Sequence, residues 1–217
     1  MRGFTQDDAH IYCTPAQAQS EIQGVLALTR RFLATFGLVR YTARLSTRPK
    51  DTVGSDADWE MATDALRGAL EVEGMRYTVD EGAGAFYGPK IDIAIFDALD
   101  RTWQCSTIQC DFNMPSRFNL EYHDSSGERQ TPVMIHRAIF GSLERFIGLL
   151  LEHYAGDLPL WLAPTQLRLL PVHESAVPYC EDIVERGRAM GLRVDLDRTN
   201  ERLNKRIRSA ELEKMPW

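Results

Sequence analysis

The segment GDLPLWLAP, residues 156–164, constrains the fold of this chain most, because its glycine and two prolines interrupt regular structure. Before it, strand-like and helix-like stretches follow one another irregularly. After it, the pattern predicts a strand, a helix, a strand and a helix, near residues 166–172, 174–190, 192–197 and 200–214. We therefore predict two domains, residues 1–159 and 160–217, with a parallel or mixed sheet in the second.

The first domain opens on a stretch that alternates as a strand does. Over residues 4–13 one face holds Phe4, Gln6, Asp8, His10 and Tyr12. Capping residues then predict a helix that follows Thr14 and ends near Gly37, and Ser55 caps a second helix near 56–73. Further strands are predicted near residues 38–46, 90–96 and 101–112.

The stretch 127–154 predicts a strand that leads into a long helix. Its helical spacing gives a buried stripe that includes Ile139, Phe146 and Ile147. On the same helix, Gly141 is expected one turn before Arg145.

Charge and cysteine content limit the classes of function. The net charge of −6 argues against a surface coated with basic residues for nucleic acid. Residues 160–217 nevertheless hold ten Lys and Arg against nine Asp and Glu, whereas the first 159 hold fifteen against twenty-two. The cysteines show no paired spacing, and we expect reduced, mostly buried thiols in a cytoplasmic protein. The sequence holds no apolar run of the roughly 18 residues that a membrane helix needs.

Five segments, in order along the chain, point to a known family: RGFTQDDAHIYC, LSTRP, GAFYGPKIDI, WQCSTIQCDF and HRAIFGSLERF. Together they resemble the threonyl-tRNA synthetases, a family of class II aminoacyl-tRNA synthetases. The linker LPLWLAPTQ resembles the start of that family's anticodon-binding domain. The resemblance implies an α+β fold, with an antiparallel class II catalytic sheet and helices over 1–159 and an α/β anticodon-binding domain over 160–217, both of them partial.

Parts of the class II motifs are present. Phe4 and Asp8 match the second half of motif 2, and Gly141, Glu144 and Arg145 match motif 3. Motif 1, which forms the homodimer interface of the family, and the arginines that precede Phe4 in motif 2 have no counterpart. The resemblance therefore predicts a fragment of a homodimeric enzyme, truncated at both ends and inactive alone.

The resemblance implies a threonine–tRNA ligase, which uses ATP and Mg²⁺ to form threonyl-adenylate and transfers threonine to tRNA(Thr). It assigns catalysis to Arg145 and Lys90, with adenine between the Phe4 ring and the Arg145 guanidinium and with Gly141 leaving room for the nucleotide. From the residues alone, Arg145 also fits a surface charge pair with Glu144, and Lys90 fits an ordinary Gly-Pro turn.

The resemblance also assigns the remaining ligand contacts. Those to ATP fall to Gln6, Gln104, Thr107 and Gln109, and those to threonine fall to Asp8, Tyr87 and Gln109. Strict alternation, however, places Gln104 and Gln109 on opposite faces of a strand. Either a bulge intervenes or one of the two reaches the site from a strand end. Asp8 alone also fits a solvated carboxylate, and Tyr87 an ordinary turn.

A zinc site is implied as well. His10 and His136 resemble two of three zinc ligands, the third being a cysteine upstream of this chain. A metal that needs the threonine hydroxyl rejects valine, whereas serine keeps the hydroxyl and calls for editing. We find no editing domain in the sequence. Without the resemblance, either histidine is more often structural or exposed.

Some alternatives stay open. The basic residues near the C-terminus suit either tRNA backbone contact or a solvated helix; they are Arg198, Arg202, Lys205, Arg206 and Arg208. The chain also fits a non-catalytic tRNA-binding or regulatory relative that lacks part of the active site. A metal hydrolase built on the two histidines lacks a third ligand and a base, and we set it aside.

Overall fold

The computed structural model describes residues 2–217; Met1, the first residue of the predicted catalytic domain, lies outside them. The chain forms two compact units, Met1–Leu149 and Leu150–Trp217. The first unit joins a mostly antiparallel sheet with helices, and the second is a small α/β unit. The predicted α+β class is confirmed.

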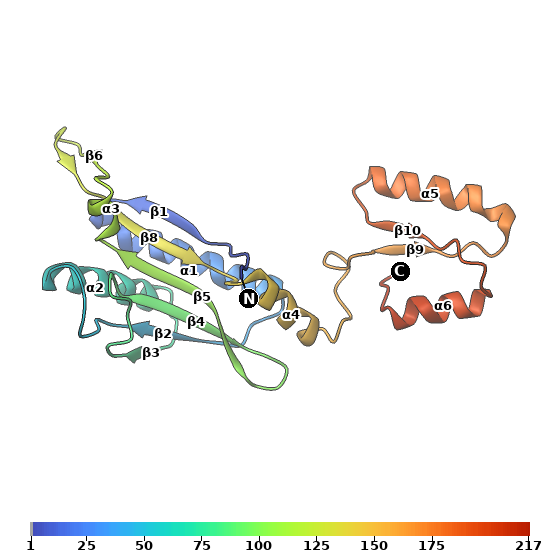
Figure 1. Cartoon of the computed structure of the whole chain (residues 1–217), viewed down its shortest axis with the longest axis horizontal. Coiled ribbons are helices and arrows are strands. Elements are labelled where there is room, and N and C mark those ends of the chain that lie inside the picture. The colour runs from blue at the N-terminus through green and yellow to red at the C-terminus, as the bar shows by residue number, and fades with distance from the viewer. Residues whose placement is uncertain (1) are drawn as a thin grey trace. The chain divides into compact units, whose positions relative to one another are not determined.

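The first unit is built on a six-stranded sheet with the order β1-β8-β5-β4-β2-β3 (Figure 1). Neighbouring strands are antiparallel, except that β2 runs parallel to β3. The strands are β1 Ala9–Cys13, β2 Tyr41–Ser46, β3 Tyr77–Asp80, β4 Lys90–Phe96, β5 Thr102–Asp111 and β8 Val133–Ala138. A separate hairpin pairs β6 Tyr122–His123 with β7 Arg129–Gln130, after the short helix α3 Met114–Arg117.

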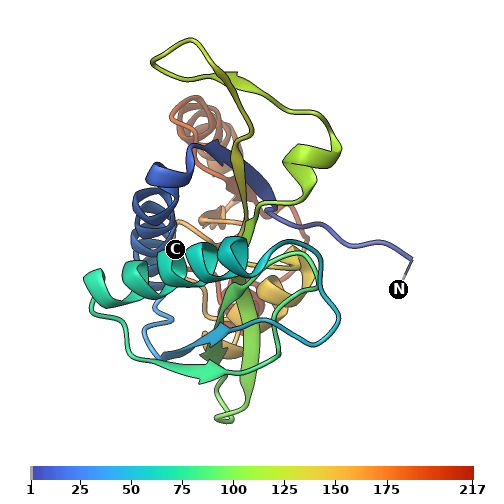
Figure 2. The ribbon, with the colours of Figure 1, turned by 90° about the vertical axis from the view of Figure 1, so that its left-hand side faces the viewer.

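Two long helices cover this sheet, α1 Ala18–Thr35 and α2 Asp56–Val72. They pack against each other and both contact β5, and Figure 2 shows them along one side of the sheet. The predicted caps are present: the Ser55 hydroxyl accepts the N–H of Asp58, and the Asp58 carboxylate accepts the N–H of Ser55 in return.

Apolar side chains on one face of the sheet form the core with these helices. On β4, Ile91, Ile93 and Ile95 are at most 1 % exposed. Because side chains alternate along a strand, Lys90 and Asp92 face the opposite side. That opposite face carries the candidate site.

Two expectations for the first unit are wrong in detail. The first strand begins at Ala9 rather than at residue 4, although Gln6 forms a bridge with Ser142. The last helix, α4 Leu143–His153, starts after Gly141, so Ile139 and Gly141 lie in the turn before it. The Asp7 carboxylate accepts the N–H groups of Ile139 and Phe140, at 2.8 and 3.0 Å, and this turn replaces the first helical turn.

The buried stripe of α4 also differs from the prediction. Ile147 is 56 % exposed, because the helix buries Phe146 and Leu149 and turns the two residues between them outward. Strand β3 has no counterpart among the predicted strands. Its four residues join the sheet through the parallel pairing with β2.

The second unit contains the predicted series of strands and helices. Strands β9 Leu167–Leu169 and β10 Val194–Leu196 are parallel, as expected, and they are separated by α5 Val177–Ala189. Helix α6 Leu203–Leu212 follows. Across residues 2–217, no helix is both long enough and apolar enough to span a membrane.

Candidate active site

Four of the predicted site residues form one row across four strands. Lys90 of β4 pairs with Gln109 of β5, Gln109 pairs with His136 of β8, and His136 pairs with His10 of β1. Directly opposite residues in adjacent strands have neighbouring side chains. The sheet therefore brings together residues from both ends of the first unit.

A cavity of about 420 Å³ lies beside this row. Of the twelve residues predicted for the site, nine line it, and they come from strand ends, loops and the start of α4. The nine are Gln6, Asp8, Tyr87, Gln104, Thr107, Gln109, His136, Gly141 and Arg145. The cavity is also lined by Cys105, Arg137 and Ala138.

A bulge in β5 explains how Gln104 and Gln109 line the same cavity. The register against β4 shifts between Ile93 and Ala94 and leaves Cys105 without a partner. One extra residue reverses the alternation of the strand beyond it. Of the two explanations left open by the sequence, the bulge is correct.

Arg145 contacts the bulged strand. Its guanidinium donates to the backbone carbonyl of Gln104. Glu144 turns to the N-terminal segment, where its carboxylate accepts the N–H of Thr5 at 2.9 and 3.1 Å. Among residues 2–217 no ion pair joins Glu144 to Arg145, so that alternative is wrong.

Gly141 and Gly88 are required where two backbones approach closely. Gly141 has a φ of +68°, and a Cβ there would lie 2.8 Å from a backbone oxygen of β5. A Cβ on Gly88 would lie only 2.0 Å from another backbone oxygen of that strand. A larger residue at either position would push its loop away from the cavity.

Gly88 fixes the loop that carries Tyr87. The Tyr87 hydroxyl donates to Gln109 Oε1 at 2.7 Å, and Asn113 Nδ2 donates to the Tyr87 carbonyl oxygen at 2.9 Å. Burial, followed by the nearby carboxylate of Asp111, raises the pKa of Tyr87 above its usual value. Tyr87 therefore stays a neutral hydroxyl at the wall of the cavity.

Three predicted residues lie outside the lining of the cavity. Lys90 Nζ lies 2.7 Å from the buried carboxylate of Asp92. The ring of His10 stands edge-on to the ring of His136, with centroids 4.6 Å apart. Phe4 is 60 % exposed, and the N–H of the neighbouring Thr5 donates to Glu144 of motif 3.

The two histidines form an incomplete metal site. His136 Nε2 lies 2.9 Å from the fully buried carboxylate of Asp111, the kind of partner that orients a metal-binding histidine. A catalytic zinc ion takes three protein ligands. In the part of the chain that the structure describes, no group of three His, Cys, Asp or Glu side chains is placed to hold a metal ion. These residues alone do not fit zinc.

Sequence reasoning missed three buried or half-buried carboxylates that organise the site: Asp7, Asp92 and Asp111. Each accepts hydrogen bonds from a site residue or from the turn before α4. No local signal marks Asp92, because alternation with core-facing isoleucines places it on the other face of the strand, where a charge is ordinarily solvated. Likewise, nothing local distinguishes Asp7 from an exposed acidic residue.

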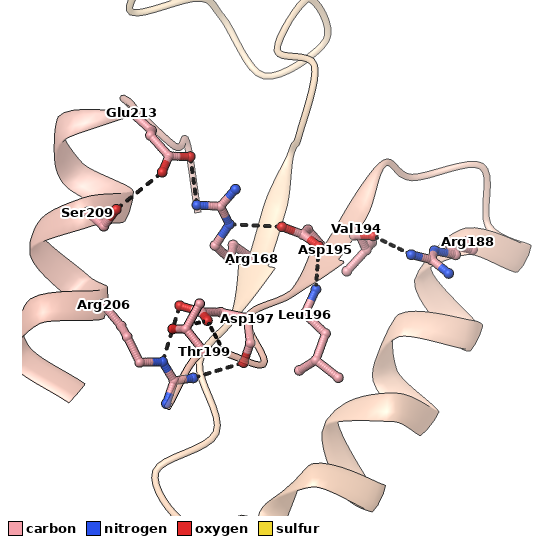
Figure 3. Close-up of polar contacts among 10 residues, drawn as sticks. All are labelled: Arg168, Arg188, Val194, Asp195, Leu196, Asp197, Thr199, Arg206, Ser209 and Glu213. Carbon is pink, nitrogen blue, oxygen red and sulfur yellow. Dashed lines mark hydrogen bonds and ion pairs between the residues drawn. The ribbon is translucent and has the colours of Figure 1, made fainter. Parts of the chain in front are cut away.

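In the second unit, Arg206 is not available to tRNA. It is 8 % exposed and donates to Asp197 Oδ2 at 3.2 Å, to the Asp197 carbonyl oxygen at 3.1 Å and to the Pro171 carbonyl oxygen at 2.8 Å. Figure 3 shows Arg206 of α6 pointing at Asp197 and Thr199 in the loop after β10. The expectation of an exposed Arg206 is wrong, since the residue anchors α6.

Of the other four basic residues, two form ion pairs and two do not. Arg198 pairs with Glu181, and Lys205 pairs with Glu201. Arg202 and Arg208 are exposed, and within residues 2–217 neither forms an ion pair. Two unpaired guanidinium groups thus remain at or near α6.

Comparisons with known proteins agree with this organisation. The family described as "tRNA synthetase class II core domain (G, H, P, S and T)" matches residues 1–154, and the family "Anticodon binding domain" matches residues 166–217. The crystal structure of the RNA binding domain of threonyl-tRNA synthetase from Cryptosporidium parvum Iowa II is 42 % identical, with a TM-score of 0.90. The match covers 98 % of this chain and 53 % of that one.

Curated relatives match the chain from end to end. "Threonine--tRNA ligase, chloroplastic/mitochondrial 2" of Arabidopsis thaliana is 56 % identical over 216 residues, and the threonine–tRNA ligase of Synechococcus sp. (strain WH7803) is 55 % identical. The chain spans about a third of each relative, 33 % and 35 %. The resemblance found in five short segments is thus confirmed, and the chain belongs to the class II aminoacyl-tRNA synthetases, among which its sequence matches the threonyl-tRNA synthetases.

Proposed function

We propose that the cavity binds threonyl-adenylate and that the chain serves a threonine–tRNA ligase. One observation carries the proposal: eight residues expected to contact ATP or threonine, drawn from positions 6 to 145, line a single cavity together with the predicted zinc ligand His136. The sequence identity of more than 50 % to named threonine–tRNA ligases supports threonine as the amino acid that is activated.

The chemistry proposed for this cavity is a displacement at phosphorus. A threonine carboxylate oxygen forms a bond to the α-phosphorus of ATP, and the bond to pyrophosphate breaks. No protein base is needed, because the attacking carboxylate carries no proton. Arg145 and Lys90 place positive charge near the reacting phosphate, and Mg²⁺ travels with ATP. The adenine ring is placed between Phe4 and Arg145, because an aromatic ring and a guanidinium group both stack on a base.

Selection of threonine is assigned to the end of the cavity near the histidines. Asp8 accepts a hydrogen bond from the threonine hydroxyl, while Tyr87 and Gln109 line the same end. When bound, zinc would coordinate the amino and hydroxyl groups of threonine. His10 and His136 would supply two of the three protein ligands that such an ion needs.

The second unit is proposed to contact the anticodon arm of tRNA(Thr) through Arg202 and Arg208. The proposal keeps a domain boundary between residues 159 and 160. It also keeps a homodimeric parent enzyme and a cytoplasmic location. The four buried, unpaired cysteines suit the reducing conditions of that compartment.

The proposal is tested by calorimetric titration with a threonyl-adenylate analogue in which a sulfamoyl group replaces the phosphate. We expect binding that Arg145→Ala weakens at least about tenfold, the usual cost of losing a charged hydrogen bond. Arg67, whose side chain is 41 % exposed and pairs with Asp64 on α2, provides the control Arg67→Ala. A chain that binds no analogue, or that loses equal affinity in both variants, would support the non-catalytic relative instead.

A further inference from the structure

Asp92 lies at the centre of a hydrogen-bond network beside the cavity. Its side chain is 8 % exposed. It forms an ion pair with Lys90 Nζ at 2.7 Å and accepts hydrogen bonds from Gln104 Nε2 at 2.6 Å and Thr107 Oγ1 at 3.0 Å. All three donors belong to residues predicted for the site, whereas Asp92 is not among the residues that line the cavity.

The strand pairing dictates this convergence. Asp92 pairs directly with Thr107 across β4 and β5, and Lys90 lies two residues away on the same face. Gln104 reaches the same carboxylate because the bulge at Cys105 turns it to this face. A strand without the bulge would point Gln104 away from Asp92.

The network determines which way the Gln104 amide points. Its Nε2 donates to Asp92 Oδ1 and also to Thr107 Oγ1, the latter at 3.0 Å. Both N–H groups are then occupied, so the Oε1 atom remains free to accept a hydrogen bond in the cavity. Gln109 is oriented the other way, because its Oε1 accepts from Tyr87 and leaves its N–H groups free.

The carboxylate also holds the charge of Lys90 in place. A buried anion without a partner is costly, so Asp92 and Lys90 are each held by the other. Replacing Asp92 by Asn keeps the size of the side chain but removes the negative charge and one of the two oxygens. The three donors can no longer all be satisfied.

We propose that Asp92 is a positioning residue of this site: its carboxylate holds Lys90 and Thr107 and turns the side-chain Oε1 atom of Gln104 toward the bound ligand. The identity of that ligand rests on the proposed function. The orientation of Gln104 does not, and it is measured separately.

Asp97 offers a matched control. It follows the same strand, is also buried, and accepts hydrogen bonds from Arg101 and Trp103, away from the cavity. The experiment compares Asp92→Asn with Asp97→Asn in the ¹⁵N-labelled full chain. Nuclear magnetic resonance follows the side-chain NH₂ signals of Gln104, and calorimetry follows the affinity for the sulfamoyl analogue.

We expect the wild-type Gln104 NH₂ protons to exchange with solvent more slowly than those of the exposed Gln19. Asp92→Asn speeds that exchange and weakens the analogue at least about tenfold, while Asp97→Asn changes neither. If Asp92→Asn fails to fold, slow exchange in the wild-type chain decides for the network and fast exchange decides against it.

Unchanged Gln104 signals in Asp92→Asn, or equal losses of affinity in the two variants, would overturn the inference. A wild-type chain that binds no analogue counts against the proposed function. Asp92 is then judged by the Gln104 signals alone.

Discussion

His10 and His136 lie directly opposite each other on β1 and β8, with ring centroids 4.6 Å apart and ring planes at 77°. The described residues add no third metal ligand to this pair. We therefore predict weak zinc binding by the chain, because two nitrogen ligands leave a catalytic-type site incomplete. Competition with a chromogenic chelator measures the affinity.

The same titration includes two variants. His10→Ala should reduce the remaining affinity, whereas His153→Ala, which removes a histidine whose ring stands edge-on to Tyr154, should leave it unchanged. Zinc that stays bound in one-to-one ratio through mild chelation would contradict the prediction.

Glu144 joins the start of α4 to the N-terminal segment by accepting the N–H of Thr5. We predict that Glu144→Ala frees this N–H and loosens the segment that carries Phe4. Hydrogen exchange at the Thr5 amide should become faster, and binding of the adenylate analogue should weaken if Phe4 stacks on adenine as proposed.

Glu152 on the far part of the same helix provides the control substitution, Glu152→Ala. It should leave Thr5 exchange unchanged. Equal protection of Thr5 in Glu144→Ala and the wild-type chain would remove the reason for assigning Glu144 this role.

Asp97 should make stability depend on pH. Burial alone would raise its pKa, but hydrogen bonds from the Trp103 indole and from Arg101 lower the pKa from 3.8 to about 2. A carboxylate whose pKa is lower in the folded state stabilises the protein above 3.8 and loses that contribution as pH falls toward about 2. The difference in unfolding free energy between wild type and Asp97→Asn should therefore shrink over this range.

Urea unfolding at several pH values measures that difference. A difference that stays constant or widens on acidification would show that folding does not lower the pKa of Asp97.

Arg206 and Arg208 are neighbours on α6 with opposite predicted effects. Arg206→Ala leaves Asp197 buried without its partner and should cost about 3 kcal/mol of stability. Arg208→Ala should leave stability within about 0.5 kcal/mol. It should instead weaken binding of a threonine tRNA transcript and lower the salt dependence by about one unit of slope.

Thermal unfolding and filter binding at several salt concentrations separate the two effects. A stable Arg206→Ala variant, or tRNA affinity that Arg208→Ala does not change, would contradict the assignment.

Much of the first unit follows from local sequence. Ser55 caps α2 as predicted, and the isoleucines of β4 face the core as alternation along a strand requires. Features that depend on contacts with residues far away in the sequence could not be predicted in this way. The turn at Gly141 replaces a helical turn because Asp7, far away in the sequence, binds its N–H groups.

The site shows the same division. Residues that a motif contains, such as Arg145 and Tyr87, were predicted by resemblance. Asp92 was not, since its importance comes from a strand pairing and a bulge that no local pattern specifies. The bulge at Cys105 was left as one of two alternatives, because a single strand read alone does not reveal where its neighbour skips a residue.

The most direct test of the central claim maps the sulfamoyl analogue onto the chain. In a ¹⁵N-labelled sample, we predict that the largest changes in backbone signals on adding the analogue fall on Tyr87, Thr107, Gln109, Ala138 and Gly141, and that signals of residues 166–217 do not move. Changes confined to the second unit, or spread evenly over the chain, would contradict the account.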